Sequence, residues 1–141
     1  AIIYRLKATQ RDDIIREMLQ HLHTIGYLKD PERATAEVLH REQIMPTGVG
    51  SGVACPHTRT SAVDNLICAI GITTAPVDFS DDEEGKNCRI IILTLTPDAP
   101  GSPYMTFITA ILTALRSERR RIAILNAQNA ADIKKALLTQ Q

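Results

Sequence analysis

The residues best placed to do chemistry lie in one stretch that ends in a proline followed by His57. From Gly48 it reads Gly-Val-Gly-Ser-Gly-Val-Ala-Cys-Pro-His. Alternate glycines allow backbone conformations that side chains would block, and they let another backbone come close. Pro56 fixes φ immediately before His57, so the imidazole leaves the chain from a stiff base. A neutral imidazole, with a usual pKa of ~6.5, keeps one nitrogen lone pair free and suits phosphoryl relay. We therefore predict that His57 carries a phosphoryl group.

A phosphorylated histidine needs hydrogen-bond donors for the phosphoryl oxygens. The stretch before His57 offers hydroxyl and backbone N–H donors. The predicted phosphoryl-binding residues are Thr47, Gly50, Ser51 and Gly52. Arg41 precedes the stretch, and its planar, permanently charged guanidinium matches phosphate geometry. Arg59, two residues after His57, is a second candidate cation.

Other chemistries fit these residues less well. The glycine-rich stretch lacks the lysine and Ser/Thr of a P-loop and differs from the Gly-x-Gly-x-x-Gly fingerprint, so a nucleotide site is not expected. His21 and His23 lie two apart on a predicted helix and point in different directions, and no metal site is predicted. Cys55 lies close to His57 in sequence, but a small buried thiol is the favoured interpretation over a Cys–His nucleophile.

Composition describes an ordinary globular domain. The 141 residues fit one domain spanning 1–141, and sixteen basic residues balance sixteen acidic ones. This balance argues against nucleic-acid and membrane-surface partners. No apolar run approaches the ~20 residues of a membrane span. Three widely spaced cysteines without a Cys-x-x-Cys pair favour a reducing, cytoplasmic setting. The chain starts at alanine with strand-like residues close behind, which is consistent with a domain cut from a longer protein.

The N-terminal part predicts a short strand followed by two helices. Residues 2–4 read as β-structure, and Thr9 with Asp12 resembles a capping box. Apolar residues then recur at helical spacing, and Gly26 supplies a stop. These are Ile14, Ile15, Met18, Leu19 and Leu22. Asp30 followed by proline predicts the N-cap of a second helix, which runs to about Gln43.

The rest of the chain predicts two buried strands and three further helices. Residues 66–72 and 89–96 are continuous apolar runs, joined by an acidic, turn-like segment at 78–86. Ser102-Pro103 opens a third helix, and two shorter helical patterns follow, the last capped by Asn129. Unbroken apolar strands suit a sheet that is covered on both faces. The predicted fold class is therefore α/β, a three-layer domain with a mixed β-sheet flanked by helices.

Residues 47–57 resemble the active-site signature of the mannitol/fructose-type enzyme IIA domains. These belong to the bacterial phosphoenolpyruvate-dependent sugar phosphotransferase system, and the group includes the nitrogen-regulatory enzyme IIA. The similarity covers essentially the whole chain, including Arg41-Glu42 before the motif and the segment from Ala75 to Phe79 after the first long strand.

The resemblance implies a transferase component that works as a phosphohistidine carrier. His57 would accept phosphate from the carrier protein HPr, or a relative of it, and pass it to a cysteine of an enzyme IIB domain. Arg41 would steady the phosphoryl group, and no cofactor would be needed because the phosphoryl group arrives activated. Family members usually carry a second active-site histidine, and here Tyr104 stands at that position. A tyrosine hydroxyl can donate a hydrogen bond but cannot become cationic near neutral pH.

Two functions therefore remain open at the level of sequence. The first is phosphate relay through His57 and Arg41. The alternative is a regulatory or interaction module with the same fold, associated with a transporter, which does not relay phosphate. Replacement of the second histidine by Tyr104 favours the alternative, whereas retention of the complete Pro-His motif favours the carrier.

Overall fold

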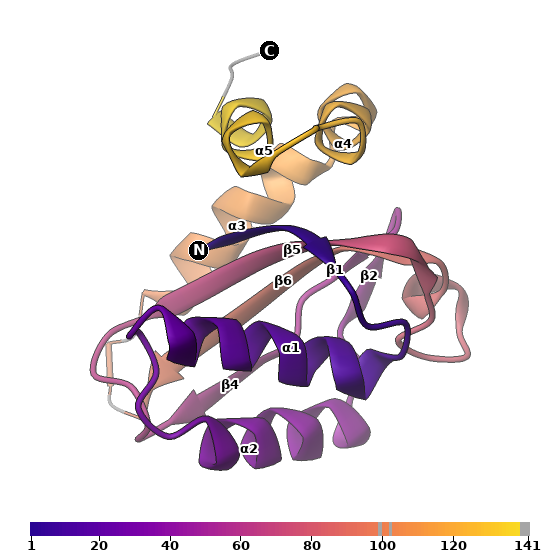
Figure 1. Cartoon of the computed structure of the whole chain (residues 1–141). Helices are drawn as coiled ribbons and strands as arrows, with labels where there is room; N and C mark the ends of the chain where they lie inside the picture. Colours follow the sequence, from indigo (N-terminus) through magenta and orange to yellow (C-terminus); the bar gives the residue numbers. More distant parts are fainter. Residues whose placement is uncertain (99, 102, 139–141) are drawn as a thin grey trace.

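The computed structural model describes residues 1–98, 100–101 and 103–138. Within these residues the chain forms three layers, with a sheet between two groups of helices (Figure 1). The helices are α1 (Arg11–Thr24), α2 (Pro31–Ile44), α3 (Tyr104–Leu115), α4 (Glu118–Leu125) and α5 (Ala130–Leu138). In this described part of the chain, no helix has the length and apolar character needed to cross a membrane.

The sheet is mixed and places the two long strands side by side. Its strands are β1 (Ile2–Leu6), β2 (Gly48–Gly50), β3 (Val53–Ala54), β4 (His57–Thr60), β5 (Ile67–Val77) and β6 (Cys88–Pro97). Their order is β1-β5-β6-β3-β2, with β4 also paired to β6. The β5–β6 pair is antiparallel, whereas β1 runs parallel to β5, and β3 and β4 run parallel to β6. A 3₁₀ turn, η1 (Glu83–Gly85), lies in the connection from β5 to β6.

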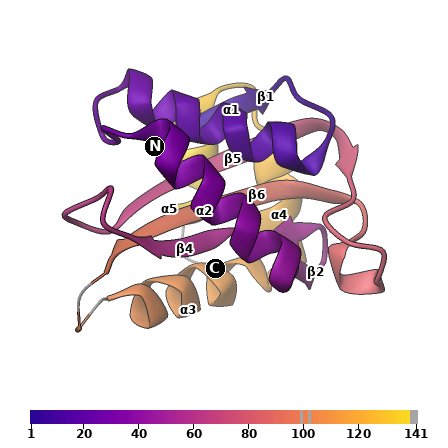
Figure 2. The same cartoon turned by 90° about the horizontal axis from the view of Figure 1, so that it is seen from below.

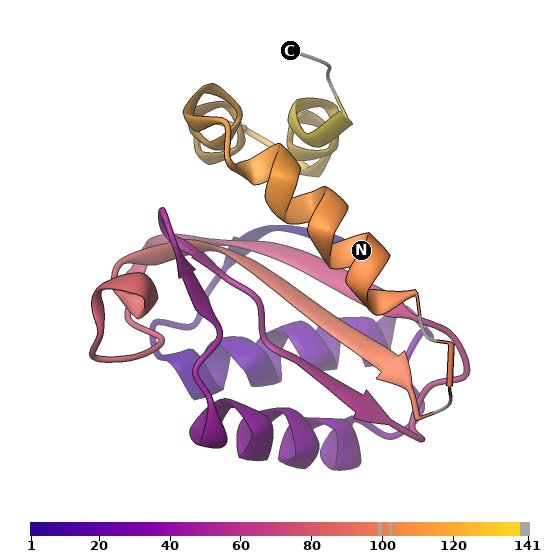
Figure 3. The same ribbon diagram turned by 180° about the vertical axis from the view of Figure 1, so that it is seen from behind.

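Alternating side chains of β6 face the two helical layers. Ile91, Leu93 and Leu95 pack with the apolar faces of α1 and α2. Ile90 and Ile92 pack on the other face with residues of α3, α4 and α5. Figures 2 and 3 show these layers, with α1 and α2 across one face and α3 to α5 on the other. The continuous apolar runs were therefore predicted correctly as strands covered on both faces.

The caps confirm most of the predicted helix boundaries. Asp30 caps α2 by accepting a hydrogen bond from the Arg33 N–H at 3.1 Å, and Gly26 has a φ of +88° just after α1. The predicted start of α1 at Thr9 is wrong. The helix begins at Arg11 after Gln10, which makes no side-chain cap. The segment before it is held instead by Glu17, whose carboxylate accepts the N–H groups at positions 7 and 8.

Candidate functional site

His57, at the end of the glycine-rich stretch, stands immediately after a break in a strand. β3 and β4 pair with successive parts of β6, so that Ala54 lies opposite Ile91 and His57 opposite Thr94. Between β3 and β4, the Cys55 N–H donates a hydrogen bond to the Thr47 carbonyl at 3.0 Å instead of to β6. Proline at position 56 has no N–H to continue the ladder. The histidine is therefore the first residue of β4, a strand that pairs with β6 at the margin of the sheet (Figure 1).

A backbone carbonyl fixes the tautomer of His57. Its Nδ1 lies 2.9 Å from the Cys55 carbonyl oxygen. Since a carbonyl oxygen only accepts, Nδ1 carries the proton, and the lone pair is on Nε2. The ring is half-buried, and burial is the main cause that lowers the pKa of His57 below its usual 6.5. The Arg41 charge lowers this pKa further, while the bond to Cys55 opposes the shift. The imidazole is therefore mostly neutral at pH 7.

Two helices bring the other predicted catalytic residues to this histidine. Tyr104, the first residue of α3, stacks on the His57 ring with centroids 4.8 Å apart and planes inclined by 25°. Burial raises the pKa of Tyr104 to about 12, so the phenol keeps its proton at neutral pH. Arg41 comes from the last turn of α2, and one of its Nη atoms donates to the Met45 carbonyl at 3.0 Å. Its charge lowers the pKa values of both His57 and Tyr104, so the structure gathers all three residues.

A buried carboxylate, which the sequence analysis did not select, anchors the start of the glycine-rich stretch. Glu42 is 1% exposed and accepts the Thr47 hydroxyl at 2.5 Å and the Thr47 N–H at 2.7 Å. The Thr47 hydroxyl is thus engaged with Glu42 rather than presented to a phosphoryl group. Burial raises the pKa of Glu42 above 4.5, and the Thr47 bonds oppose that rise. The sequence did contain a signal for the burial of Glu42, because this residue continues the four-residue spacing of Ala34 and Val38 on the buried face of α2.

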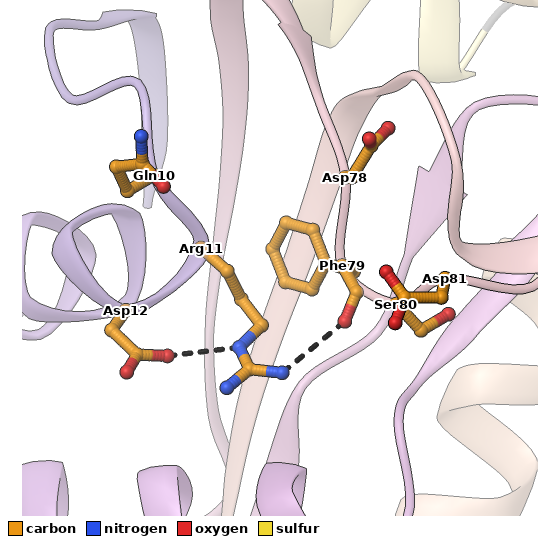
Figure 4. A pocket seen from close by; sticks show the side chains of 7 residues that line it. All are labelled: Gln10, Arg11, Asp12, Asp78, Phe79, Ser80 and Asp81. Carbon is orange, nitrogen blue, oxygen red and sulfur yellow. Dashed lines mark hydrogen bonds and ion pairs between the residues drawn. The ribbon is translucent and has the colours of Figure 1, made fainter.

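Arg11 is a second cation whose charge lowers the pKa of Glu42. It lines a polar hollow near the start of α1, drawn in Figure 4. There its guanidinium donates to Asp12 at 2.8 Å and to the Phe79 carbonyl at 3.3 Å. The second bond ties α1 to the segment after β5.

The predicted glycine donors lie away from His57. The Gly52 carbonyl accepts the N–H groups of Arg89 and Ile90, at 2.9 and 3.1 Å. His57 lies opposite Thr94, four to five residues further along β6, which is roughly 13–17 Å of extended strand. Gly50 and Ser51 belong to the same hairpin as Gly52, and the tip contributes to a hollow beside Leu112 and Leu115, late in α3. The predicted phosphoryl-binding role of Gly50, Ser51 and Gly52 therefore does not fit this geometry.

The glycines instead shape the hairpin. Gly50, Ser51 and Gly52 have φ values of +87°, +57° and +77°, in the region that favours glycine. Gly48 has the backbone of Gly85 so close that no Cβ would fit. The alternating glycines thus serve a left-handed turn and a close backbone approach.

The remaining sequence candidates have plainer roles. Cys55 is 4% exposed, and burial raises its pKa to about 12, so its thiol is not a ready nucleophile. This confirms the prediction of a small buried thiol. Arg59 is exposed on β4. His23 Nδ1 lies 2.7 Å from the Leu28 carbonyl oxygen and holds the turn after α1.

Solved structures share this architecture. The nitrogen regulatory protein IIA-Ntr from Neisseria meningitidis superposes with a TM-score of 0.83 at 22% identity, covering 96% of this chain and 92% of that one. The mannitol enzyme IIA of Escherichia coli, solved in complex with phosphorylated enzyme IIB, gives a TM-score of 0.79 at 21% identity over 96% of this chain and 92% of that chain. These likenesses confirm the three-layer α/β fold.

Sequence comparison identifies the family. The PTS system 2-O-alpha-mannosyl-D-glycerate-specific EIIABC component of Escherichia coli K12 is 28% identical over 139 residues, or 97% of this chain. The chain spans only 21% of the length of that relative. Residues 1–140 match the family described as "Phosphoenolpyruvate-dependent sugar phosphotransferase system, EIIA 2". The chain therefore belongs to the EIIA 2 family of the phosphoenolpyruvate-dependent sugar phosphotransferase system.

Proposed function

We propose that the chain is a phosphohistidine carrier, with Nε2 of His57 as the phosphoryl acceptor. The observation that carries this proposal is the hydrogen bond from Nδ1 to the Cys55 carbonyl. It leaves the Nε2 lone pair available, while the lowered pKa keeps that atom unprotonated at pH 7. The phosphoryl donor is HPr or a related phosphohistidine protein, and the acceptor is a cysteine of an enzyme IIB domain.

Phosphoryl transfer to His57 and from His57 to IIB each require no cofactor, because every bond that breaks is matched by one that forms. Nε2 attacks the phosphorus of the donor phosphohistidine, a new N–P bond forms, and the donor's N–P bond breaks with its electron pair returning to the donor ring. The Nδ1 proton stays in place, and its bond to the Cys55 carbonyl stabilises the positive charge on the phosphorylated ring. In the second step the IIB thiolate attacks phosphorus, and the N–P electron pair returns to Nε2. Arg41 supplies positive charge for the phosphoryl oxygens in both steps.

The surface beside the site suits contact with a partner protein. Met45 and Ile44, at the end of α2, are 59% and 67% exposed, and Met105 beside Tyr104 is 69% exposed. Methionine adapts its shape to different partners. The likeness to a mannitol enzyme IIA that was solved with phosphorylated IIB supports an enzyme IIB domain as one partner. HPr and IIB would then bind, one after the other, to the same surface formed by Ile44, Met45 and Met105.

Intact-mass spectrometry tests the carrier function. The protein is incubated with phosphoenolpyruvate, enzyme I and HPr, and an acid-lability check follows. We expect the gain of one acid-labile phosphate, lost in His57→Ala although that variant keeps the far-UV circular dichroism of the parent. Labelling that persists in His57→Ala would refute the assignment of the acceptor.

A second candidate function is regulation without relay. It is favoured by Tyr104, which covers one face of the His57 ring, and by the likeness to the nitrogen regulatory protein IIA-Ntr. This function predicts no phosphate gain with several HPr relatives. Tyr104→His separates the two functions further, since faster labelling or a longer-lived phosphoform would show that position 104 acts in the transfer.

A further inference from the structure

Three neighbouring strands lose their regular pairing at the end of the sheet away from His57. The register between β1 and β5 shifts between Ile3 and Leu6, and that between β5 and β6 shifts between Ile72 and Val77. On β6, two successive N–H groups, those of Arg89 and Ile90, share one acceptor, the Gly52 carbonyl. Irregularities of this kind include β-bulges, which re-aim side chains and are over-represented beside functional sites. Here Arg5 and Arg89 come to line one cavity.

The cavity lies between these strands and the end of α4. It measures about 100 Å³, and Ile72, Ile124 and Leu125 contribute apolar walls. The helices α4 and α5 lie on this side of the sheet, with α5 in contact with β1 (Figure 1). A volume of this size is well below the roughly 300 Å³ of pockets that hold whole drug-sized molecules. It suits a single small group, with the rest of a ligand left in solvent.

The two arginines bring positive charge that the described residues do not neutralise. Arg89 donates through one Nη atom to the Thr73 carbonyl at 2.9 Å, while its Nε is buried without a hydrogen-bond partner in the described part of the chain. Arg5 donates to the Tyr4 hydroxyl at 3.2 Å and lies over that ring. No carboxylate side chain lines the cavity, and the ion pairs between described residues involve neither arginine. A buried N–H without a partner is costly, so this arrangement calls for an acceptor.

We propose that the Arg5–Arg89 cavity binds a phosphate group, either as inorganic phosphate or as part of a small phosphate ester. Guanidinium groups match the geometry of tetrahedral oxyanions and form charge-assisted bonds with them. The Arg89 Nε–H then gains an acceptor, and Arg5 closes the exposed side. The site is separate from His57, since Arg89 precedes by five residues the Thr94 that pairs with His57. It therefore does not depend on the carrier function.

NMR titration of the whole chain tests this site. The probe is inorganic phosphate at pH 7, with sodium chloride at matched ionic strength as the control, and the readout is the Arg89 Nε–H signal. We expect a saturable shift in the millimolar range that chloride does not reproduce. Arg5→Gln should weaken the affinity about tenfold, because one charge-assisted bond is lost. Arg119→Gln, which removes an exposed arginine of α4 outside the cavity, should leave the affinity unchanged.

A parallel titration with glycerol phosphate distinguishes the sources of the phosphate group. Tighter binding than inorganic phosphate supports a small ester as the ligand, and equal binding supports phosphate itself. The proposal is overturned if phosphate shifts only signals around His57, or if chloride gives the same response. It is also overturned if Arg5→Gln binds phosphate as tightly as the parent. Arg5 is exposed, so this last variant tests the site even if substitution of Arg89 unfolds the protein.

Discussion

Thr47→Val should reveal how strongly the buried Glu42 carboxylate holds the site together. The Thr47 hydroxyl donates to Glu42 at 2.5 Å, and the Thr47 carbonyl accepts the Cys55 N–H at 3.0 Å. The Cys55 carbonyl in turn holds Nδ1 of His57. Valine keeps the branched shape and the backbone bonds of threonine but removes the O–H donor. The substitution therefore perturbs one hydrogen bond at the start of this chain of contacts.

The expected loss in the free energy of unfolding is about 2 kcal/mol at pH 7, because hydrogen bonds to charged groups contribute ~1.5–3 kcal/mol. Glu42 is only 1% exposed, so water does not replace the missing donor. A loss of that size shifts the folding equilibrium roughly 30-fold. Burial raises the pKa of Glu42 above 4.5. Below pH 4.5 the carboxyl is protonated, the bond is no longer charge-assisted, and the loss should fall toward ~1 kcal/mol.

Urea unfolding at pH 7 and below pH 4.5 measures both quantities. Thr58→Val is the matched control, since that hydroxyl makes only a 3.3 Å bond to the Arg59 carbonyl at a half-buried position of β4. We expect the control to change stability by less than about 0.5 kcal/mol. If Thr47→Val and Thr58→Val have equal stability at pH 7, Glu42 does not depend on the Thr47 hydroxyl, and the reasoning fails.

Three further predictions concern the charges and the ring around His57. Arg41→Met should raise the pKa of His57 in an NMR titration, because the Arg41 charge lowers it, whereas Arg59→Met should not. Tyr104→Phe should keep the ring stack and the lowered pKa of His57. Tyr104→Leu should return the pKa of His57 toward 6.5, because loss of the stacked ring admits water. Equal pKa values of His57 in the two variants would contradict this. Because the pKa of Glu42 is raised in the folded protein, this carboxyl adds stability that is complete below pH 4.5 and is lost as pH rises through the raised pKa. Glu42→Gln should therefore flatten the decline in thermal stability above pH 4.5. An unchanged slope would implicate another group.

Local signals in the sequence were sufficient for most of the fold. Asp30 with Pro31 marks the start of α2 because a side-chain cap and a preset φ act on neighbouring residues alone. The apolar face of α1 follows from helical spacing. The prediction at Thr9 failed because Glu17, the seventh residue of α1, accepts the N–H groups of positions 7 and 8. The capping pattern covers only four neighbouring residues, so it cannot reveal a contact between residues nine or ten apart.

The candidate site was only partly predictable for the same reason. The residue types of His57, Arg41 and Tyr104 indicate their chemistry, and the structure gathers them. The positions of the glycine donors depend on which residues of β6 face them, and that register is a non-local property. Adjacency in sequence suggested that Ser51 lies near His57, whereas extended backbone separates neighbouring residues by about 3.3 Å each, so several residues of strand carry His57 far from the hairpin tip.

The placement of His57 meets two opposing requirements of the proposed relay. An acceptor nitrogen must stay unprotonated near neutral pH, which burial favours, yet a second protein must reach it, which burial opposes. Tyr104 covers one face of the ring and the strand's own carbonyl binds Nδ1, so the ring is half-buried and its pKa falls. Among the described strands, β4 pairs only with β6, so its other margin carries no further strand. The break at Pro56 starts a new strand at that margin. Because of this break, the His57 imidazole is partly shielded from water and still accessible to a partner protein.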